Sequence, residues 1–318
     1  MLSLEQGSFA DKKDHVGNRL SEMRKSGDGR EMTVLTRETV REIVQAFQKS
    51  GLEMCELTIP EGVEEIADAA CIGMEQLQIV HMPRSLRRIG MLAFYGCRNL
   101  KEVHFPAGLK EIGTAAFKEC GLIKITVPLK VNSMGSEVFA DNPLKYAEIE
   151  GSSTSAAMFR GCRRLTRIVL GDRIRTLAEG MMRDCESLKS ICIPESVKTL
   201  EKDVFRGCRT LSRVRLPESA TEIGAGAFYG CGIRSIRIPE KIRVVRAETF
   251  CMCEKLGVVW LPQNVVCVES GAFYGCTALK KVCIEAELGR LAGLEIGEEN
   301  SPLLAAVLRC GVKPEEFK

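Results

Sequence analysis

Short runs of alternating apolar and polar residues recur along the chain, and each ends at a proline or a glycine: LKEVHFP, LTRIVLG, LKSICIP, LSRVRLP and LGVVWLP. In the first run, Leu100, Val103 and Phe105 are expected to face inward. Glu102 and His104 are expected to face outward. Because proline has no N–H for a sheet ladder, these runs predict short, half-buried strands that end where the proline stands.

A second pattern keeps the phase of these strands. The phenylalanine of a segment A-F-x-G-C marks a position, the Phe slot, that recurs at a nearly constant interval: Cys71, Phe94, Phe117, Phe139, Phe159, Met182, Phe205, Phe228, Phe250 and Phe273. Cysteine stands three positions after the slot in most of these repeats. One repeat is too small to bury its apolar side alone. Stacked repeats are therefore expected to share one core and a long parallel sheet.

The unit L-x-x-(I/V)-x-(I/L/F)-P followed by (I/L)-x-x-x-A-F-x-G-C resembles the BspA-like subclass of leucine-rich repeats, and the resemblance covers roughly residues 52 to 285. It implies a β-rich (α/β), right-handed leucine-rich-repeat solenoid of about 10 to 11 repeats. A parallel sheet would form one face, and short extended pieces and tight helical turns the other. The resemblance also implies a non-catalytic scaffold that binds proteins or glycans, often at cell surfaces.

Short helical caps are expected at both ends of this solenoid. Residues 1 to 30 are polar and predict a flexible tail, and residues 31 to 51 predict a capping helix that begins after Thr36 and runs to about Lys49. The simplest role of that helix is to cover the first repeat, and partner binding is the alternative. Residues 286 to 318 are expected to form the other cap, with a helix from Ser301-Pro302 through the apolar run LLAAVLRC.

One repeat departs from the pattern. The interval between Phe139 and Phe159 is the shortest of the series, Asn142 replaces the cysteine, and GSSTS replaces the usual stretch after the proline. We expect a local bulge or a change of curvature at residues 140–160.

Charge and hydropathy narrow the possible functions. The chain of 318 residues carries 45 Lys+Arg and 42 Asp+Glu, a net charge of +3 that does not favour nucleic acid as a partner. No apolar stretch is long enough to cross a bilayer as a helix, so no membrane span is expected. No signal peptide is visible, which predicts a cytoplasmic protein, or a cell-surface one if a leader has been removed.

The cysteines and histidines are the first candidates for chemistry. The cysteine column, which recurs once per repeat, is expected to be buried and structural, with a metal or redox role as the alternative. His81 and His104 are expected to be neighbours on adjacent strands, as a solvated pair rather than a metal site. Cys192 and Cys283 are predicted at outward strand positions. With no catalytic or cofactor-binding motif, we expect no cofactor and no enzyme; a thiol- or metal-dependent enzyme is a remote alternative.

Charge along the chain points to a binding face. Residues 160 to 246 carry 19 Lys+Arg against 10 Asp+Glu, whereas residues 53 to 75 carry seven acids and neither Lys nor Arg. Outward strand positions give the candidate partner-binding face: Tyr146, Arg167, Arg213, Arg215, Arg237 and Trp260. We expect a protein-interaction scaffold that binds an acidic protein segment, with a glycan-binding or adhesion module for anionic glycan as the alternative. A simpler explanation is that the arginines are solvated and pair with acids at the rim.

Overall fold

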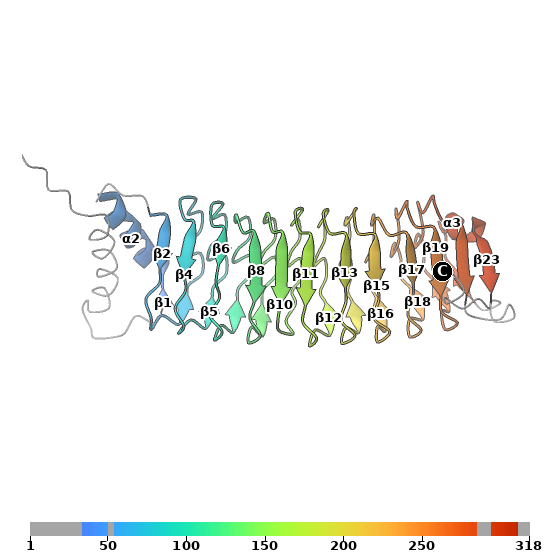
Figure 1. Ribbon diagram of the computed structural model, residues 1–318, viewed down its shortest axis with the longest axis horizontal. Helices are drawn as coiled ribbons and strands as arrows, with labels where there is room; N and C mark the ends of the chain where they lie inside the picture. The colour runs from blue at the N-terminus through green and yellow to red at the C-terminus, as the bar shows by residue number, and fades with distance from the viewer. Residues whose placement is uncertain (1–33, 50–53, 285–293, 311–318) are drawn as a thin grey trace, which may run out of the picture.

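The computed structural model describes residues 34–49, 54–284 and 294–310, and these form an elongated stack of parallel strands (Figure 1). The tail expected at residues 1 to 30 lies outside the described residues, as does much of the C-terminal segment. No helix within the described residues is long and apolar enough to cross a membrane.

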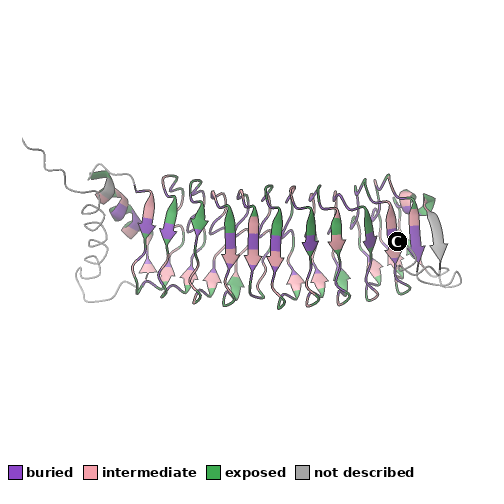
Figure 2. Cartoon of the chain, in the orientation of Figure 1, coloured by how far each residue is buried: buried purple, intermediate pink, exposed green. Residues whose placement is uncertain are grey.

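One side of the stack is a row of strands, the long row, that matches the alternating runs of the sequence. Its members are β2 (Glu56–Thr58), β4 (Ile79–His81), β6 (Glu102–Val103), β8 (Lys124–Val127), β10 (Tyr146–Ile149), β11 (Arg167–Leu170), β13 (Ser190–Cys192), β15 (Arg213–Arg215), β17 (Ser235–Arg237), β19 (Val258–Leu261), β21 (Lys281–Ile284) and β23 (Val307–Cys310). All pairings in this row are parallel, for example Ala147 with Ile125 and Ile168. Along most strands buried residues alternate with more exposed ones (Figure 2), as the period of two predicts.

A second row, the short row, runs along a different side. Its members are β1 (Val34–Leu35), β3 (Glu65–Ile66), β5 (Arg88–Ile89), β7 (Glu111–Ile112), β9 (Ser133–Met134), β12 (Thr176–Leu177), β14 (Thr199–Leu200), β16 (Glu222–Ile223), β18 (Val244–Val245), β20 (Cys267–Val268) and β22 (Glu295–Ile296). These two-residue strands are the short extended pieces that the sequence led us to expect. A solenoid with two strand rows therefore encloses the core.

The third side, the turn row, carries the Phe slot. Every side chain from Cys71 to Phe273 in this slot is fully buried. Successive phenylalanine rings are stacked, with centroids 5.0 Å apart for Phe94 and Phe117 and 5.3 Å apart for Phe205 and Phe228. Helical turns were expected here, but the turns are not helical. Residues on both sides of the slot have left-handed backbone conformations, such as Leu92 (φ 56°) and Gly96 (φ 73°).

The cysteine column lies directly beside the phenylalanines. Its thiols are buried, and each lies close to the carbonyl oxygen of the Phe slot one repeat earlier, as Cys120 Sγ does to Phe94 O (3.0 Å) and Cys231 Sγ to Phe205 O (3.1 Å). Asn142 takes the same place and donates from Nδ2 to Phe117 O (2.7 Å). The column therefore supplies one weak S–H donor per turn to a carbonyl that the core shields from water.

The shortened repeat is regular in one row and altered in another. β10 pairs residue by residue with β8 and β11, so the bulge expected at residues 140–160 is absent from the long row. In the short row, no strand is found among the described residues between β9 and β12. There Thr154 donates from Oγ1 to Thr176 O (2.8 Å) in place of a ladder. Most of the missing residues are thus taken from the side of the short row.

The two ends differ from each other. Helix α2 (Arg37–Lys49) begins after Thr36, whose Oγ1 accepts a hydrogen bond from Thr39 N (3.2 Å), and it buries Val40 and Ile43. At the other end, α3 (Ser301–Ala305) has only five residues. The prediction that helix continues through LLAAVLRC is wrong, because β23 pairs with β21 as a further strand of the long row.

Candidate interaction surface

The exposed face of the long row, the strand face, presents outward side chains in two columns. The first outward column contains Lys124, Tyr146, Arg167, Ser190, Arg213, Ser235 and Val258. The second contains Thr126, Glu148, Val169, Cys192, Arg215, Arg237 and Trp260. Within each sheet of the row the strands are parallel and in register, so neighbouring side chains of a column are there spaced by about 4.8 Å.

All six candidate residues lie on this face. Tyr146 and Arg167 are direct cross-strand neighbours in the first column, and Arg237 and Trp260 are direct neighbours in the second. Arg213 and Arg215 both belong to β15, one in each column. The candidates therefore extend along the strand face instead of converging on one point.

Tyr146 is held between two cations. The ammonium of Lys124 lies 5.4 Å from the centre of the Tyr146 ring, and the guanidinium of Arg167 lies 5.8 Å from it. The phenol donates to Glu148 Oε2 (2.9 Å), and this hydrogen bond is the main reason why the pKa of Tyr146 is raised. The ring thus separates two like charges on adjacent strands, and each gains a cation–π contact.

Arg215 and Arg237 have acidic neighbours at the rim. Arg215 lies 3.8 Å from Glu195, and Arg237 lies 3.2 Å from Glu218. In both pairs the acid comes from the turn that follows the preceding strand of the long row. Pairing with rim acids therefore explains how these two arginines are accommodated.

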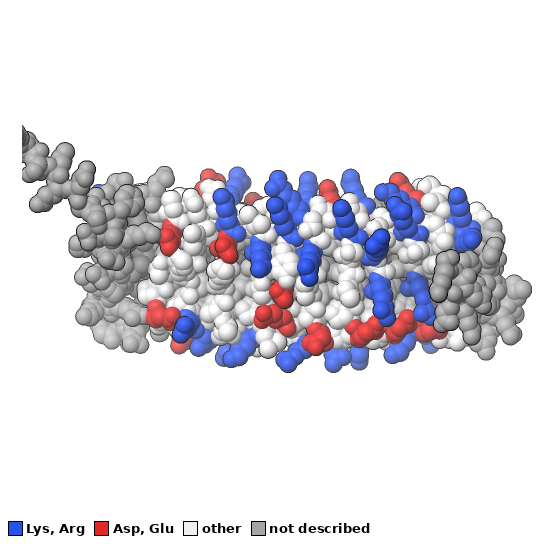
Figure 3. Space-filling model, viewed as in Figure 1, with Lys and Arg blue, Asp and Glu red and all other residues white. Residues whose placement is uncertain are grey.

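Other basic side chains belong to the same surface, although the sequence analysis did not single them out. We define the basic face as a set of exposed Lys and Arg residues on this surface. They stand in the first outward column, at the position just before it, or at the ends of β15 and β17: Lys101, Lys124, Lys145, Arg167, Lys189, Arg213, Arg215, Arg234 and Arg237. Figure 3 shows such side chains over the upper half of the strand face, with many acidic side chains along the lower edge. Arg167 and Arg213 form no ion pair with any described residue.

Several basic side chains of the turn row, in contrast, are paired. Lys118 and Arg160 both contact Glu137 (2.8 Å each), and Arg206 contacts Asp203 (3.3 Å). These acids stand at positions with left-handed backbone, where Asp203 has φ 56°. Part of the positive charge of residues 160 to 246 is therefore balanced on the turn row.

The two cysteines predicted on the outward positions differ. Cys192 is exposed on β13, as predicted. Cys283 is buried, so its predicted exposure is wrong. It lies on β21 between β19 and β23, in register with Trp260 and Arg309.

Each of the two histidines lies beside a glutamate. His81 Nε2 lies 2.6 Å from Glu56 Oε1, and His104 Nε2 lies 3.1 Å from Glu102 Oε1. The paired residues of β4 and β6 end at Val80 and Val103, so His81 and His104 are not paired across the two strands. The part of the chain that the structure describes holds no group of three or more His, Cys, Asp or Glu side chains placed to bind a metal ion.

Comparison with known proteins identifies the repeat. The sequence profile of the BspA type Leucine rich repeat region matches residues 42–165, 153–257 and 178–293 in six copies. No curated protein matches the chain. Among solved structures, a leucine-rich repeat protein from Bacteroides ovatus is 27% identical with a TM-score of 0.57, over 82% of this chain and 65% of that one, slightly under two thirds of its length. A leucine-rich repeat protein from Eubacterium ventriosum shares the fold at 17% identity and a TM-score of 0.52, over 81% of this chain and 80% of that one. The chain belongs to the BspA-type leucine-rich repeat family.

Proposed function

We propose that the chain is a non-catalytic interaction scaffold that binds an acidic protein segment along its basic face. The observation that carries this proposal is the continuity of the charge. Seven consecutive strands of the long row, from β6 to β17, each have at least one exposed Lys or Arg on or just before the strand. At about 4.8 Å per strand this stretch is about 29 Å long, which corresponds to roughly nine residues of extended peptide.

Charge complementarity supports an acidic partner. Arg167 and Arg213 are exposed and have no described acid beside them, so their guanidinium groups are available for bidentate hydrogen bonds to carboxylates. Binding to these two residues would not require an existing ion pair to break. Arg215 and Arg237, in contrast, would first have to leave Glu195 and Glu218.

The test compares two matched double variants. Arg167→Gln with Arg213→Gln removes two charges from the basic face, and Arg173→Gln with Arg175→Gln removes two exposed charges from the segment before the short strand β12. A labelled Glu-rich 12-residue peptide and its Gln counterpart serve as probes. We expect the first variant to lose at least about tenfold in affinity for the Glu peptide and the second to bind like the wild type. Equal affinities of the two variants would contradict the proposal.

An anionic glycan is the second candidate partner. Trp260 is half-buried and lies beside Arg237 in register, which places an aromatic ring next to a cation, an arrangement suited to an acidic sugar. A sulfated dextran oligosaccharide in the same assay distinguishes the two partners. Trp260→Ala should weaken binding of the oligosaccharide and leave the Glu peptide unaffected if the glycan is the partner.

A further inference from the structure

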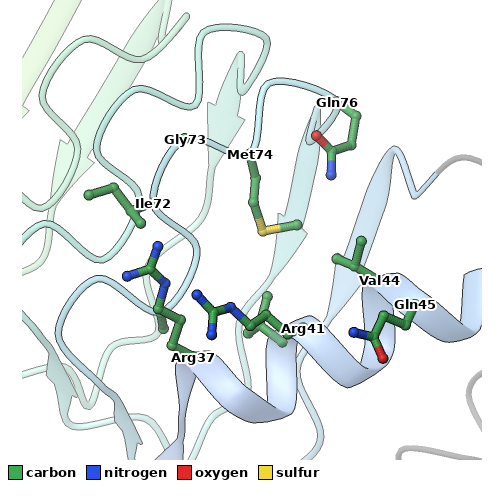
Figure 4. Close-up of a pocket in the computed structure, with 10 residues that line it drawn as sticks. Arg37, Arg41, Val44, Gln45, Ile72, Gly73, Met74 and Gln76 are labelled. Carbon is green, nitrogen blue, oxygen red and sulfur yellow. The ribbon is translucent and has the colours of Figure 1, made fainter. Parts of the chain in front are cut away.

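A groove lies at the N-terminal end of the solenoid, far from the centre of the basic face. It has a volume of about 370 Å³ and is bounded by α2 on one side and by the first turn of the turn row on the other. Figure 4 shows Arg37 and Arg41 extending from α2 towards the turn that carries Ile72 and Gly73. Val44 and Met74 line the end of the groove farther along the helix.

The two arginines form no ion pair within the described residues. Both Arg37 and Arg41 are exposed. Glu38 follows Arg37 directly and stands three residues before Arg41, and Glu42 follows Arg41 directly, but no ion pair joins either glutamate to an arginine of the helix. Arg37 is also the first residue of α2, where the helix dipole is positive and a second positive charge is unfavourable. Both effects favour an anion in the groove.

The opposite wall offers unpaired backbone acceptors. In every later repeat the turn row accepts hydrogen bonds from the turn before it, as Ala93 O does from Cys71 N (2.7 Å) and Tyr95 O from Gly73 N (2.7 Å). The equivalent carbonyls of the first turn belong to Ala70 and Ile72, and no described residue donates to either. Both residues line the groove. In the short row, β1 pairs with the outer edge of β3, the first strand contributed by the repeats. The described part of the turn row has no comparable segment at its outer edge.

We propose that this groove binds an extended acidic peptide from a partner protein. The peptide N–H groups would donate to Ala70 O and Ile72 O and continue the turn row by one layer, and its carboxylates would pair with Arg37 and Arg41. A peptide satisfies both walls at once, because it carries N–H donors and carboxylates on the same short segment. A simple anion would satisfy only the arginines. This site is independent of the basic face.

The first experiment uses a fluorescein-labelled peptide, GVEVEVG, and its counterpart with Gln in place of Glu, with fluorescence anisotropy on the full chain. We expect Arg37→Gln with Arg41→Gln to weaken binding of the Glu peptide by about tenfold or more, and replacement of Glu by Gln in the peptide to have little further effect on that variant. The matched control is Arg173→Gln with Arg175→Gln before β12, outside both the groove and the basic face, which should bind the peptide like the wild type. If Arg167→Gln with Arg213→Gln loses affinity for this peptide and the α2 variant does not, the peptide binds the basic face and the groove proposal is wrong, while the proposed function stands.

The second experiment tests the backbone acceptors and the identity of the occupant. Two peptides are made, one with N-methyl groups on the odd-numbered amide nitrogens and one on the even-numbered. Both keep the charge, but each lacks one set of N–H donors, so one of the two should lose affinity for the wild type. Equal binding of both methylated peptides and of the unmodified peptide would overturn the proposed hydrogen bonds to Ala70 O and Ile72 O. Substituting Glu22, Asp28 and Glu31 by their amides in the full chain should leave peptide affinity unchanged. Tighter binding would show that the chain's own N-terminal segment competes for the groove, and would overturn the assignment to a partner protein.

Discussion

Truncation of Phe205 to alanine tests the stacked core at a position that has a phenylalanine ring on one side and a methionine on the other. The Phe205 ring is fully buried and stacks on Phe228 on one side (5.3 Å, planes 14° apart), but the slot on its other side holds Met182. A buried Phe side chain removes at least about 150 Å² from water, which corresponds to roughly 4 kcal/mol at about 25 cal/mol per Å². Alanine keeps part of this gain, but a cavity forms, so we expect Phe205→Ala to lower the free energy of unfolding by about 3–5 kcal/mol.

Guanidinium denaturation followed by circular dichroism measures this loss, and native-state hydrogen exchange shows where it falls. Each repeat contacts mainly its neighbours, so the amides of the two adjacent repeats should lose the most protection. Lys198→Ala, an exposed position in the same repeat, serves as the control and should change stability by less than about 0.5 kcal/mol. A loss below about 1 kcal/mol for Phe205→Ala would refute the assignment of the slot to a shared core.

Two further predictions concern titratable groups. In an alkylation time course on the folded protein at pH 8, Cys192 should react quickly and the cysteines of the column slowly. The thiolate is the reactive form, and burial raises the pKa of Cys162, Cys208 and Cys276 to about 12. Cys283 should also react slowly because it is buried, and rapid labelling of the column would contradict the structure. A hydrogen bond from Lys118, with the charges of Arg160 and Lys118, lowers the pKa of Glu137 below 4.5, so its contribution to stability is present above that pH and is lost as the pH falls through the lower native value. Glu137→Gln should therefore be less stable than the wild type at pH 7, with the difference vanishing in acid, and a difference independent of pH would contradict this.

The core could be predicted from the sequence because its pattern is periodic. The fixed interval between phenylalanines determines which side chains meet, and even Met182, which breaks the residue type but not the interval, is fully buried in the expected place. Asn142 shows the same principle for a polar residue. It replaces a cysteine and donates to Phe117 O, the carbonyl that a cysteine would reach at that position. The geometry of the stack, more than the chemistry of one side chain, fixes what this position must do.

The ends could not be predicted in the same way, because there the periodic pattern stops. The run LLAAVLRC is compatible with a helix by composition, but the unpaired edge of β21 supplies partners that favour a strand at Val307–Cys310. The prediction for Cys283 also fails at this end, where Cys283 on β21 is buried and lies in register with Arg309 of β23. Both errors therefore fall at the last repeat, where the periodic pattern no longer determines what lies next to a strand.

The net charge of the chain conceals a separation of charges that the repeat itself produces. At +3 overall, the net charge by itself does not suggest anion binding. The fold places acids such as Glu137 and Asp203 on the turn row, where they pair with Lys118, Arg160 and Arg206. It places basic residues before and on the long strands, where Arg167 and Arg213 have no described acidic neighbour. Because side chains at one repeat position always reach the same side of the stack, a nearly neutral chain presents one paired surface and one basic surface.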